Sequence, residues 1–494
     1  MRSPVIRRAS RAASILIATL AIAACQRSDA GKTNVIVIGD RPSIVDPASG
    51  PLTQPQAILL ANVGQGLVRF DATGQIVPGL AERWNVTDDG LSYIFRLQTS
   101  EWPDGRKITA DQVSRLLRRQ ITSRSNNSLK DTLGAIDQIT PMTDRVIEIS
   151  LKAPRPHLLQ LLAQPEFAII REGEGTGPFQ ISPKSKPEML VLKRSILSAD
   201  DEETVREEVL LGARSAPAAV QAFIKGDTDL VLGGTFADLP YARTKDMPKN
   251  ALRFDPATGL FGLVPARPTG PAADPEFRRL LSEAIDRQAL IDALNVPGLL
   301  PRATVLEPGL DGIQNPAPPQ WAGTPIDQRR AQLAADANRI FGGLDKPVIS
   351  IALPDSPGGK ILLSRLASDW GAIGIAVEAA GPGKPADLKL LDAVAPSTSP
   401  AWFLRSLRCD AVPVCDPEID ALLDGARAAT VAAQRNALLA QGAQMIDDKQ
   451  LFIALAAPIR WSLVSSRVQG FANNRFASHT LTWLQQRPDR ERGQ

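Results

Sequence analysis

The sequence predicts an α/β protein with two or three domains. Its 494 residues exceed what one hydrophobic core usually supports. Strand-like and helix-like segments alternate: residues 347–379 read as strand, helix and strand, and a right-handed crossover would place the two strands side by side. Hydrophobic residues make up 44% and charged residues 22% of the chain, which is ordinary for a globular protein.

The first 24 residues have the layout of an export signal. Four arginines precede a short apolar stretch at 12–20, and Ile22-Ala23-Ala24 then leads to Cys25. The apolar stretch is too short for a good membrane span. This site resembles the lipobox of bacterial lipoproteins, so we expect residues 1–24 to be a signal peptide and Cys25 to be lipidated. The alternative is an ordinary secretory signal that happens to contain a cysteine. Residues 25–33 are expected to form a tether.

The isoelectric point of the whole chain, about 8.8, is basic because of the arginines in this leader. The whole chain carries a net charge of +3, and removing the four arginines of the leader, which has no acidic residue, leaves −1. No basic patch remains that would favour nucleic-acid binding.

The region 61–113 is the part around which the rest of the chain can be organised. Asp-Gly and Pro-Gly pairs mark its turns. Thr109 and Gln112 have the spacing of a capping box, which predicts a helix from there. Four apolar residues alternate before it, as in a half-buried strand: Leu91, Tyr93, Phe95 and Leu97.

Five fragments of this region, in order and at the right spacing, resemble the extracellular solute-binding protein family 5, the peptide/nickel-binding class that serves ABC importers. The fragments are Gly66-Leu67-Val68-Arg69-Phe70-Asp71, Ile76-Val77-Pro78-Gly79-Leu80-Ala81-Glu82-Arg83-Trp84, Asp88-Asp89-Gly90 with Tyr93-Ile94-Phe95-Arg96-Leu97, Asp104-Gly105, and Thr109-Ala110-Asp111-Gln112-Val113. Later fragments extend the resemblance to nearly the whole mature chain: Gly175-Thr176-Gly177-Pro178-Phe179, Ala284-Ile285-Asp286-Arg287 and Val468-Gln469-Gly470.

The resemblance implies a two-lobed type II periplasmic binding protein fold (cluster C). Two α/β lobes would close on a ligand at their interface, with an extra strand-rich domain on the first lobe. By analogy, the domains have these bounds: 34–58, 173–258 and 467–490 for the first lobe, 59–172 for the extra domain, and 259–466 for the second lobe.

The implied function is that of a substrate-binding lipoprotein of an ABC importer. It would capture an oligopeptide-like solute, a modified peptide or another small molecule and deliver it to the permease. We expect a monomer on the periplasmic side, held to the inner or outer membrane through its lipid alone. The alternative is an envelope receptor or scaffold that kept the fold without the importer, because a fold by itself does not fix a function.

The chain offers little for catalysis. Its two histidines, His157 and His479, lie far apart and have no acidic or cysteine neighbours at ligand spacing. Signatures of zinc proteases and of nucleophile elbows are absent, and Gly173–Phe179 lacks the Lys-Ser/Thr of a phosphate loop. We therefore predict a protein that is not an enzyme and that needs no metal and no cofactor.

Apart from Cys25, whose thiol would carry the lipid, the chain has two cysteines, Cys409 and Cys415. In an exported protein, an even pair six residues apart predicts a disulfide that closes a small loop. Two free thiols are the alternative, and a metal pair is disfavoured because no histidine lies nearby.

Residues 395–404 resemble the run in which peptide-binding members of the family carry the aspartate that pairs with the peptide's free ammonium. Pro400, Phe403 and Leu404 keep the frame of this run, but Pro396 stands at the position of the aspartate. Proline offers neither charge nor N–H, and a buried ammonium without a carboxylate is costly. We therefore predict a ligand other than an ordinary peptide with a free amino terminus.

Five residues are the candidates for ligand contact. Ser397 and Ser399 would supply hydroxyls, Trp402 an aromatic wall, and Arg41 of the first lobe a partner for an anionic group. Asp392 is the competing candidate, because a shift of four residues would bring it to the vacant position and restore peptide recognition.

Overall fold

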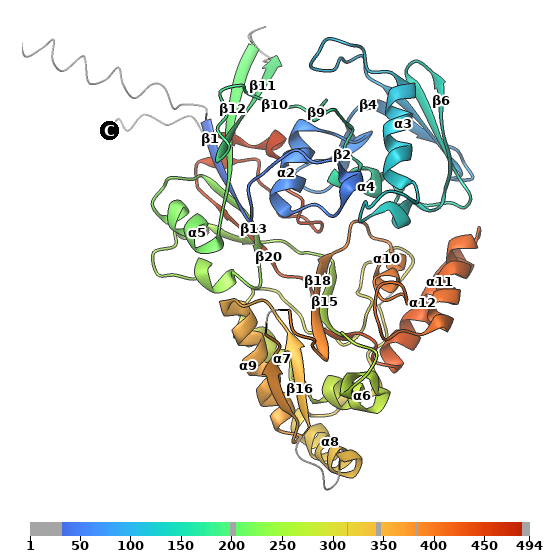
Figure 1. The fold of residues 1–494 in the computed structure, drawn as a ribbon, viewed down its shortest axis with the longest axis vertical. Helices are drawn as coiled ribbons and strands as arrows, with labels where there is room; N and C mark the ends of the chain where they lie inside the picture. The colour runs from blue at the N-terminus through green and yellow to red at the C-terminus, as the bar shows by residue number, and fades with distance from the viewer. Residues whose placement is uncertain (1–31, 198–203, 314, 342–346, 382, 487–494) are drawn as a thin grey trace, which may run out of the picture.

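The fold consists of two sheet-based lobes and a third, strand-rich domain. In Figure 1 the seven-stranded sheet and the extra domain lie side by side at the top, and the five-stranded sheet lies below them. The two-lobed α/β fold that the sequence predicts is therefore confirmed. The computed structural model describes residues 32–197, 204–313, 315–341, 347–381 and 383–486.

The first lobe is built on the seven-stranded sheet. Its central strand β1 (Lys32–Ile38) pairs in parallel with β12 (Thr204–Arg214) and β13 (Leu230–Thr235). Helix α2 (Gln54–Val63) packs on one face of β1 and α5 (Ala216–Ile224) on the other, so the strand is apolar on both sides. The sheet is completed by β10 (Gln180–Ile181), β11 (Met189–Leu197), β20 (Arg460–Val464) and β14 (Leu252–Phe254), in the order β10-β11-β12-β1-β13-β20-β14.

The extra domain holds a four-stranded antiparallel sheet in the order β4-β5-β7-β6. In β5 (Ser92–Leu97) buried and exposed residues alternate as predicted. Helix α3 (Ala110–Ile121) begins with the predicted capping box between Thr109 and Gln112. The other elements are β2 (Val68–Phe70), β3 (Ile76–Pro78), β4 (Ala81–Val86), β6 (Ile136–Thr143), β7 (Val146–Leu151) and α4 (Leu158–Leu162).

The chain leaves the extra domain through a hairpin of β8 (Ile170–Arg171) and β9 (Glu174–Gly175). A Cβ atom at Gly175 would lie 2.2 Å from the carbonyl oxygen of Val63, at the end of α2. Gly175 therefore allows the backbone of β9 to approach the end of α2 closely, which is a packing role and not that of a phosphate loop.

The second lobe is built on a five-stranded sheet in the order β17-β16-β18-β15-β19. Strand β15 (Gly259–Pro265) runs antiparallel to β18 (Leu388–Val394). Strands β16 (Val348–Ala352) and β17 (Ala376–Ala379) pair in parallel across helix α9 (Pro357–Gly371), which confirms the predicted crossover. The remaining elements are α6 (Pro275–Ala284), α7 (Arg287–Leu294), α8 (Ile326–Phe341), α10 (Pro400–Arg405), α11 (Pro417–Ala428), α12 (Ala432–Asp448) and β19 (Ile453–Ala456).

Short elements complete the chain. Cys409 and Cys415 are joined by a disulfide in the loop between α10 and α11, with Cα atoms 5.1 Å apart. Strands β21 (Val468–Gln469) and β22 (Gln485–Gln486) form a small ribbon. The 3-10 helices are η1 (Pro47–Ser49), η2 (Lys130–Leu133), η3 (Pro165–Phe167), η4 (Leu239–Ala242), η5 (Pro271–Ala273), η6 (Gln320–Gly323) and η7 (Leu481–Trp483).

Three of the predicted domain boundaries differ from the units of the structure. Strand β1 begins at Lys32, inside the predicted tether at 25–33. Helix α2 continues through the boundary at residue 58. Strand β20 pairs with β13 and β14 of the first-lobe sheet, although the boundary at residue 466 assigns it to the second lobe. The lobes are thus joined by two short segments, 255–258 and 457–459.

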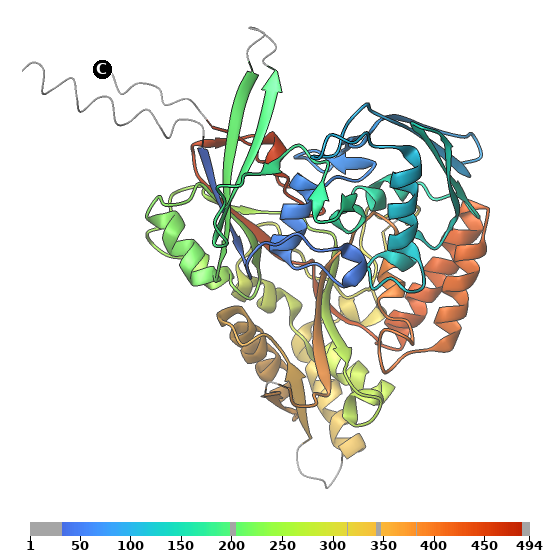
Figure 2. The same cartoon turned by 45° about the horizontal axis from the view of Figure 1, so that its top comes forward.

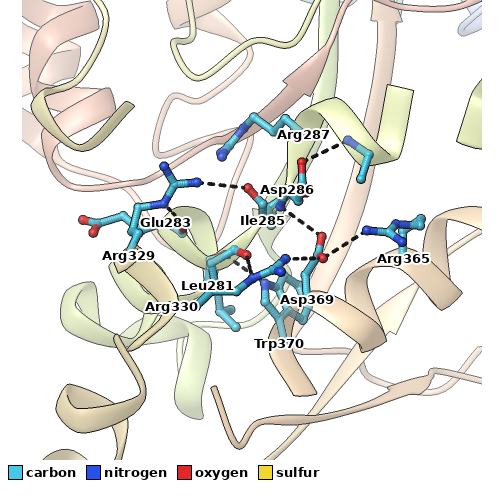
Figure 3. Close-up of polar contacts among 12 residues, drawn as sticks. Leu281, Glu283, Ile285, Asp286, Arg287, Arg329, Arg330, Arg365, Asp369 and Trp370 are labelled. Carbon is cyan, nitrogen blue, oxygen red and sulfur yellow. Dashed lines mark hydrogen bonds and ion pairs between the residues drawn. The ribbon is translucent and has the colours of Figure 1, made fainter. Parts of the chain in front are cut away.

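A buried polar network ties the helices of the second lobe together (Figure 3). The carboxylate of Asp369 on α9 accepts hydrogen bonds from Arg330 Nη2 at 2.5 Å, from Arg365 Nη2 at 3.3 Å and from the backbone nitrogen of Asp286 at 3.1 Å. The side chain of Asp369 is 1% exposed. Helices α8 and α9 and the junction of α6 with α7 therefore share one buried carboxylate.

A second carboxylate of this lobe makes stability depend on pH. Burial raises the pKa of Asp447 to about 7, although its carboxylate accepts a hydrogen bond from the Val305 nitrogen at 2.8 Å. Because this pKa lies above that of an unfolded aspartate, the contribution of Asp447 is fully present below about pH 4 and is lost as the pH rises through about 7.

Asp447→Asn is expected to remove this slope, because an amide oxygen still accepts from Val305 without becoming charged. At pH 8 the variant should be about 1–3 kcal/mol more stable than the parent, and at pH 4 nearly equal. Urea denaturation from pH 4 to 8 measures this, with Asp355→Asn, at an exposed aspartate of the same lobe, as control. A pH slope that survives in Asp447→Asn would show that another group carries it.

The predicted signal peptide, Cys25 and the start of the predicted tether lie outside the described residues. Within the part of the chain that the structure describes, no helix is both long and apolar enough to cross a bilayer.

Candidate functional site

Helices α11 and α12 of the second lobe lie beside the extra domain in both views of the fold (Figures 1 and 2). Where the two units meet they line a partly open cavity of about 250 Å³, here called the interlobe cavity. Residues 131–161 of the extra domain line one side of it and residues 397–439 of the second lobe the other. A ligand held there would contact both units at once.

A second cavity, of about 340 Å³, is bounded by all three units. It is lined by α2 and residues 476–479 from the first lobe, residues 164–166 from the extra domain and residues 394–396 from the second lobe. Trp402 lines this cavity and the interlobe cavity. The two cavities therefore share one aromatic wall.

Three of the five predicted contact residues line the interlobe cavity: Ser397, Ser399 and Trp402. Ser399 precedes Pro400 at the first position of α10, a common way to begin a helix. The indole of Trp402 packs edge-on against the buried ring of Phe403, with ring centres 5.2 Å apart. The start of α10 thus presents two hydroxyls and an indole to the cavity.

Arg41 and Asp392 lie elsewhere. Arg41 follows β1, is exposed and lines neither cavity. Asp392 lies in β18 and accepts hydrogen bonds from Arg460 Nη1 at 2.8 and 3.1 Å. Burial raises the pKa of Asp392, and the Arg460 guanidinium opposes that rise. Its carboxylate already has a cationic partner, and it also lines neither cavity.

Pro396 lines the second cavity and also takes part in the contact between units. Its carbonyl oxygen accepts a hydrogen bond from Gln164 Nε2 of the extra domain at 2.6 Å. Gln160 Oε1 accepts one from the Thr398 nitrogen at 2.9 Å. The run 396–399 is therefore held against the extra domain.

Further contacts hold α11 against the extra domain. Arg155 Nη2 donates to the carbonyl oxygen of Arg427 at 2.5 Å, and Arg427 Nη2 donates to that of Gly134 at 2.8 Å. A Cβ atom at Gly134 would overlap the Arg427 guanidinium, so the glycine is what admits this arginine. The second lobe and the extra domain are in direct contact across the cavity.

The sequence analysis missed four arginines that line the interlobe cavity: Arg155, Arg405, Arg427 and Arg435. Burial, together with the charges of Arg435, Arg427 and Arg405, lowers the pKa of Arg155 to about 10. These residues share no motif, and three of them lie on separate helices, where an arginine usually reads as part of a solvated face. Only the packing of the extra domain on the second lobe brings them together.

The histidine of this cavity adds little charge. Burial lowers the pKa of His157 to about 4, so its imidazole is neutral near pH 7. Among the described residues, no group of three or more His, Cys, Asp or Glu side chains is placed to hold a metal ion.

Comparison with known proteins places the chain among binding proteins. The model of the bacterial extracellular solute-binding proteins, family 5, matches residues 75–394. The probable di/tripeptide-binding protein 5 of Pseudomonas aeruginosa is 26% identical over 471 residues, which cover 83% of this chain and 87% of that protein.

Solved structures share the fold. OppA of Haemophilus influenzae in complex with a peptide gives a TM-score of 0.79 at 18% identity, covering 93% of this chain and 100% of that chain. The Escherichia coli murein tripeptide binding protein MppA gives 0.78 at 18% identity, over 93% and 99% of the two chains. An unliganded, open form of MppA gives 0.67 at 20% identity, over 93% and 98%. Because the family model covers more than half of the sequence, the chain belongs to the bacterial extracellular solute-binding proteins of family 5.

Proposed function

We propose that this protein is the substrate-binding component of an ABC importer and captures its solute between the second lobe and the other two units. The observation that carries the proposal is the interlobe cavity, which both sides line and which direct hydrogen bonds close. A solute bound there would contact both sides at once, and separation of the lobes would break those contacts. Family membership supports delivery of the solute to a permease.

Two features support opening by a hinge. Segments 255–258 and 457–459 join the lobes, and short connections of this kind can absorb the backbone rotation of a closing domain. The TM-score between this chain and one structure of MppA is also higher than the TM-score with the open, unliganded form of MppA. We infer that the structure represents the closed state.

The solute is proposed to be peptide-like, a modified peptide or another small molecule, captured without an aspartate for a free ammonium. Pro396 at that position offers no charge, and the Asp392 carboxylate is occupied by Arg460. Ser397, Ser399 and Trp402 remain the proposed contacts.

Native mass spectrometry of freshly purified protein tests this function. The spectrum should show a small solute bound to the chain, and Trp402→Ala should lose most of it because the shared wall of both cavities is gone. Trp483→Ala, at a partly exposed tryptophan, is the matched control and should keep the solute. A ligand-free spectrum after gentle purification would contradict the proposal, and so would equal retention in both variants.

We further propose that Cys25 is diacylated and that the monomer acts in the periplasm, where Cys409 and Cys415 stay oxidised. Cys25→Ser is expected to move the protein from the membrane fraction to the soluble periplasmic fraction, because the thiol that would carry both acyl chains is lost. Detection of an unmodified mature amino terminus in the parent protein would rule the anchor out. Alkylation of both Cys409 and Cys415 without reduction would exclude the disulfide.

A further inference from the structure

We propose that the interlobe cavity holds an anionic group of the solute, a carboxylate or a phosphate, and that Arg405 is its principal partner. The inference rests on the proposed function and names the class of solute that the site would take. The charges of the cavity lining, the partners of each arginine and the size of the cavity carry it.

The lining carries more positive than negative side chains. Four arginines face two aspartates, Asp131 and Asp311, which leaves an excess of two positive charges. Asp311 is engaged within the second lobe, since it accepts a hydrogen bond from Thr398 Oγ1 at 2.6 Å. The arginines come from the loop before α4 and from α10, α11 and α12, so they converge on one space from four elements.

Arg155, Arg427 and Arg435 each donate a hydrogen bond across the boundary between the extra domain and the second lobe. In none of these bonds is the acceptor a carboxylate. Arg155 and Arg427 donate to backbone carbonyl oxygens, and Arg435 Nη1 donates to the Pro154 carbonyl oxygen at 3.3 Å. Carbonyl groups position a guanidinium without neutralising it. The excess of two positive charges in the cavity lining is therefore not removed by direct ion pairs across the two units.

Arg405 has the most available guanidinium. It forms no hydrogen bond and no ion pair with the described part of the chain. Burial lowers the pKa of Arg405, and Arg427 lowers it further, while Asp131 opposes. A partly buried guanidinium with five donors and no acceptor is suited to a planar or tetrahedral anion, which it can bind at two oxygens.

Arg408 lies on the same segment and provides the contrast. Its Nη1 pairs with Asp424 at 2.8 Å, and its Nε lies 3.8 Å from Asp420 and 3.9 Å from Asp410. Arg408 is thus compensated by three acids and does not line the cavity. The acid on α11 that lies near Arg405, Asp424, is already engaged in this pairing.

The size of the cavity fits part of a solute. About 250 Å³ accommodates a side-chain-sized acidic group, and the second cavity beyond Trp402 offers about 340 Å³ for the remainder. An anion bound beside Arg405 would also reduce the mutual repulsion of the four arginines. Binding would therefore favour the closed state.

Matched peptide pairs test the inference. Full-length protein in detergent, stripped of solute, is titrated calorimetrically with Ala-Glu-Ala and Ala-Gln-Ala, and with Ala-phosphoserine-Ala and Ala-Ser-Ala, each with a free and an acetylated amino terminus. All peptides are amidated at the carboxyl terminus, so that the central side chain carries the only anionic group. The members of a pair share their backbone and differ chiefly in charge. The acidic member should bind at least about tenfold more tightly, and the preferred pair distinguishes a carboxylate from a phosphate.

Arg405→Gln should abolish this preference, whereas Arg408→Gln should keep it. Thermal unfolding of the ligand-free variants shows that both are folded: Arg405→Gln should match or exceed the parent midpoint because repulsion falls, and Arg408→Gln should lower it. Equal binding of both members of each pair would overturn the inference and leave the proposed function standing.

If no peptide binds, the solute that co-purifies with the protein decides. A neutral or cationic solute overturns the anion inference alone, and an anionic one that Arg405→Gln releases supports it. Absence of any solute would overturn the proposed function together with the inference.

Discussion

Asp369→Ala is expected to lower the free energy of unfolding by about 3–5 kcal/mol, since it leaves two guanidiniums in the second lobe without their buried carboxylate. Arg330 and Arg365 both bond to this side chain, which is 1% exposed. The change also removes the acceptor for the Asp286 nitrogen at the junction of α6 and α7 (Figure 3). Urea denaturation followed by tryptophan fluorescence measures the loss, because the indole of Trp370 is buried beside the network.

Asp336→Ala is the matched control. Asp336 also bonds to two arginines, Arg279 at 3.0 Å and Arg339 at 3.3 Å, but its side chain is 35% exposed. Water can replace its contacts, so the loss should stay below about 1 kcal/mol. If both variants lose the same free energy of unfolding, burial of Asp369 does not determine how much its ion pairs contribute to stability.

Asp392→Ala is expected to cost about 2–4 kcal/mol, because Arg460 then keeps its charge in a largely buried place without a counterion. Asp392 lies in the second-lobe strand β18 and Arg460 in the first-lobe strand β20, so the pair spans the two lobes beside a connecting segment. The double variant Asp392→Ala/Arg460→Met should recover most of the loss, since no unpaired charge remains. Urea denaturation of both variants checks this, with the exposed Glu82→Ala, which should cost less than about 1 kcal/mol, as control.

The same residue tests the competing hypothesis for the ligand. Asp392→Asn keeps a hydrogen-bonding side chain of the same shape. Calorimetry with unmodified di- to pentapeptides should give little binding to either protein. Micromolar or tighter binding that disappears in a folded Asp392→Asn variant would make this carboxylate the peptide's anchor and contradict the assignment based on Pro396.

Local patterns predicted much of the fold. Alternation in β5, the capping box at Thr109 and the crossover from β16 to β17 depend on neighbouring residues, and all three are confirmed. The sheet that β20 joins depends on its pairing with β13, more than two hundred residues earlier. No local signal carries such a pairing, and the second-lobe boundary was misplaced for that reason.

The candidate site was predictable in part. The resemblance to the family predicted that residues 395–404 contribute ligand contacts. Three of them line the interlobe cavity: Ser397, Ser399 and Trp402. Arg405 stands one residue after that run, yet its position reads as a solvated helix end. Its importance comes from Arg155, which another domain supplies from 250 residues away. The charge of a cavity between domains is a property of their packing and is not visible in either segment alone.

The central claim is that the lobes close on a solute, and small-angle X-ray scattering tests it most directly. Protein carrying its co-purified solute is compared with the same protein after the solute is stripped in denaturant and the chain is refolded. The account predicts a larger radius of gyration for the stripped protein and a return to the smaller value when the released solute is added back. An unchanged radius of gyration in all three samples would contradict closure of the lobes around a ligand.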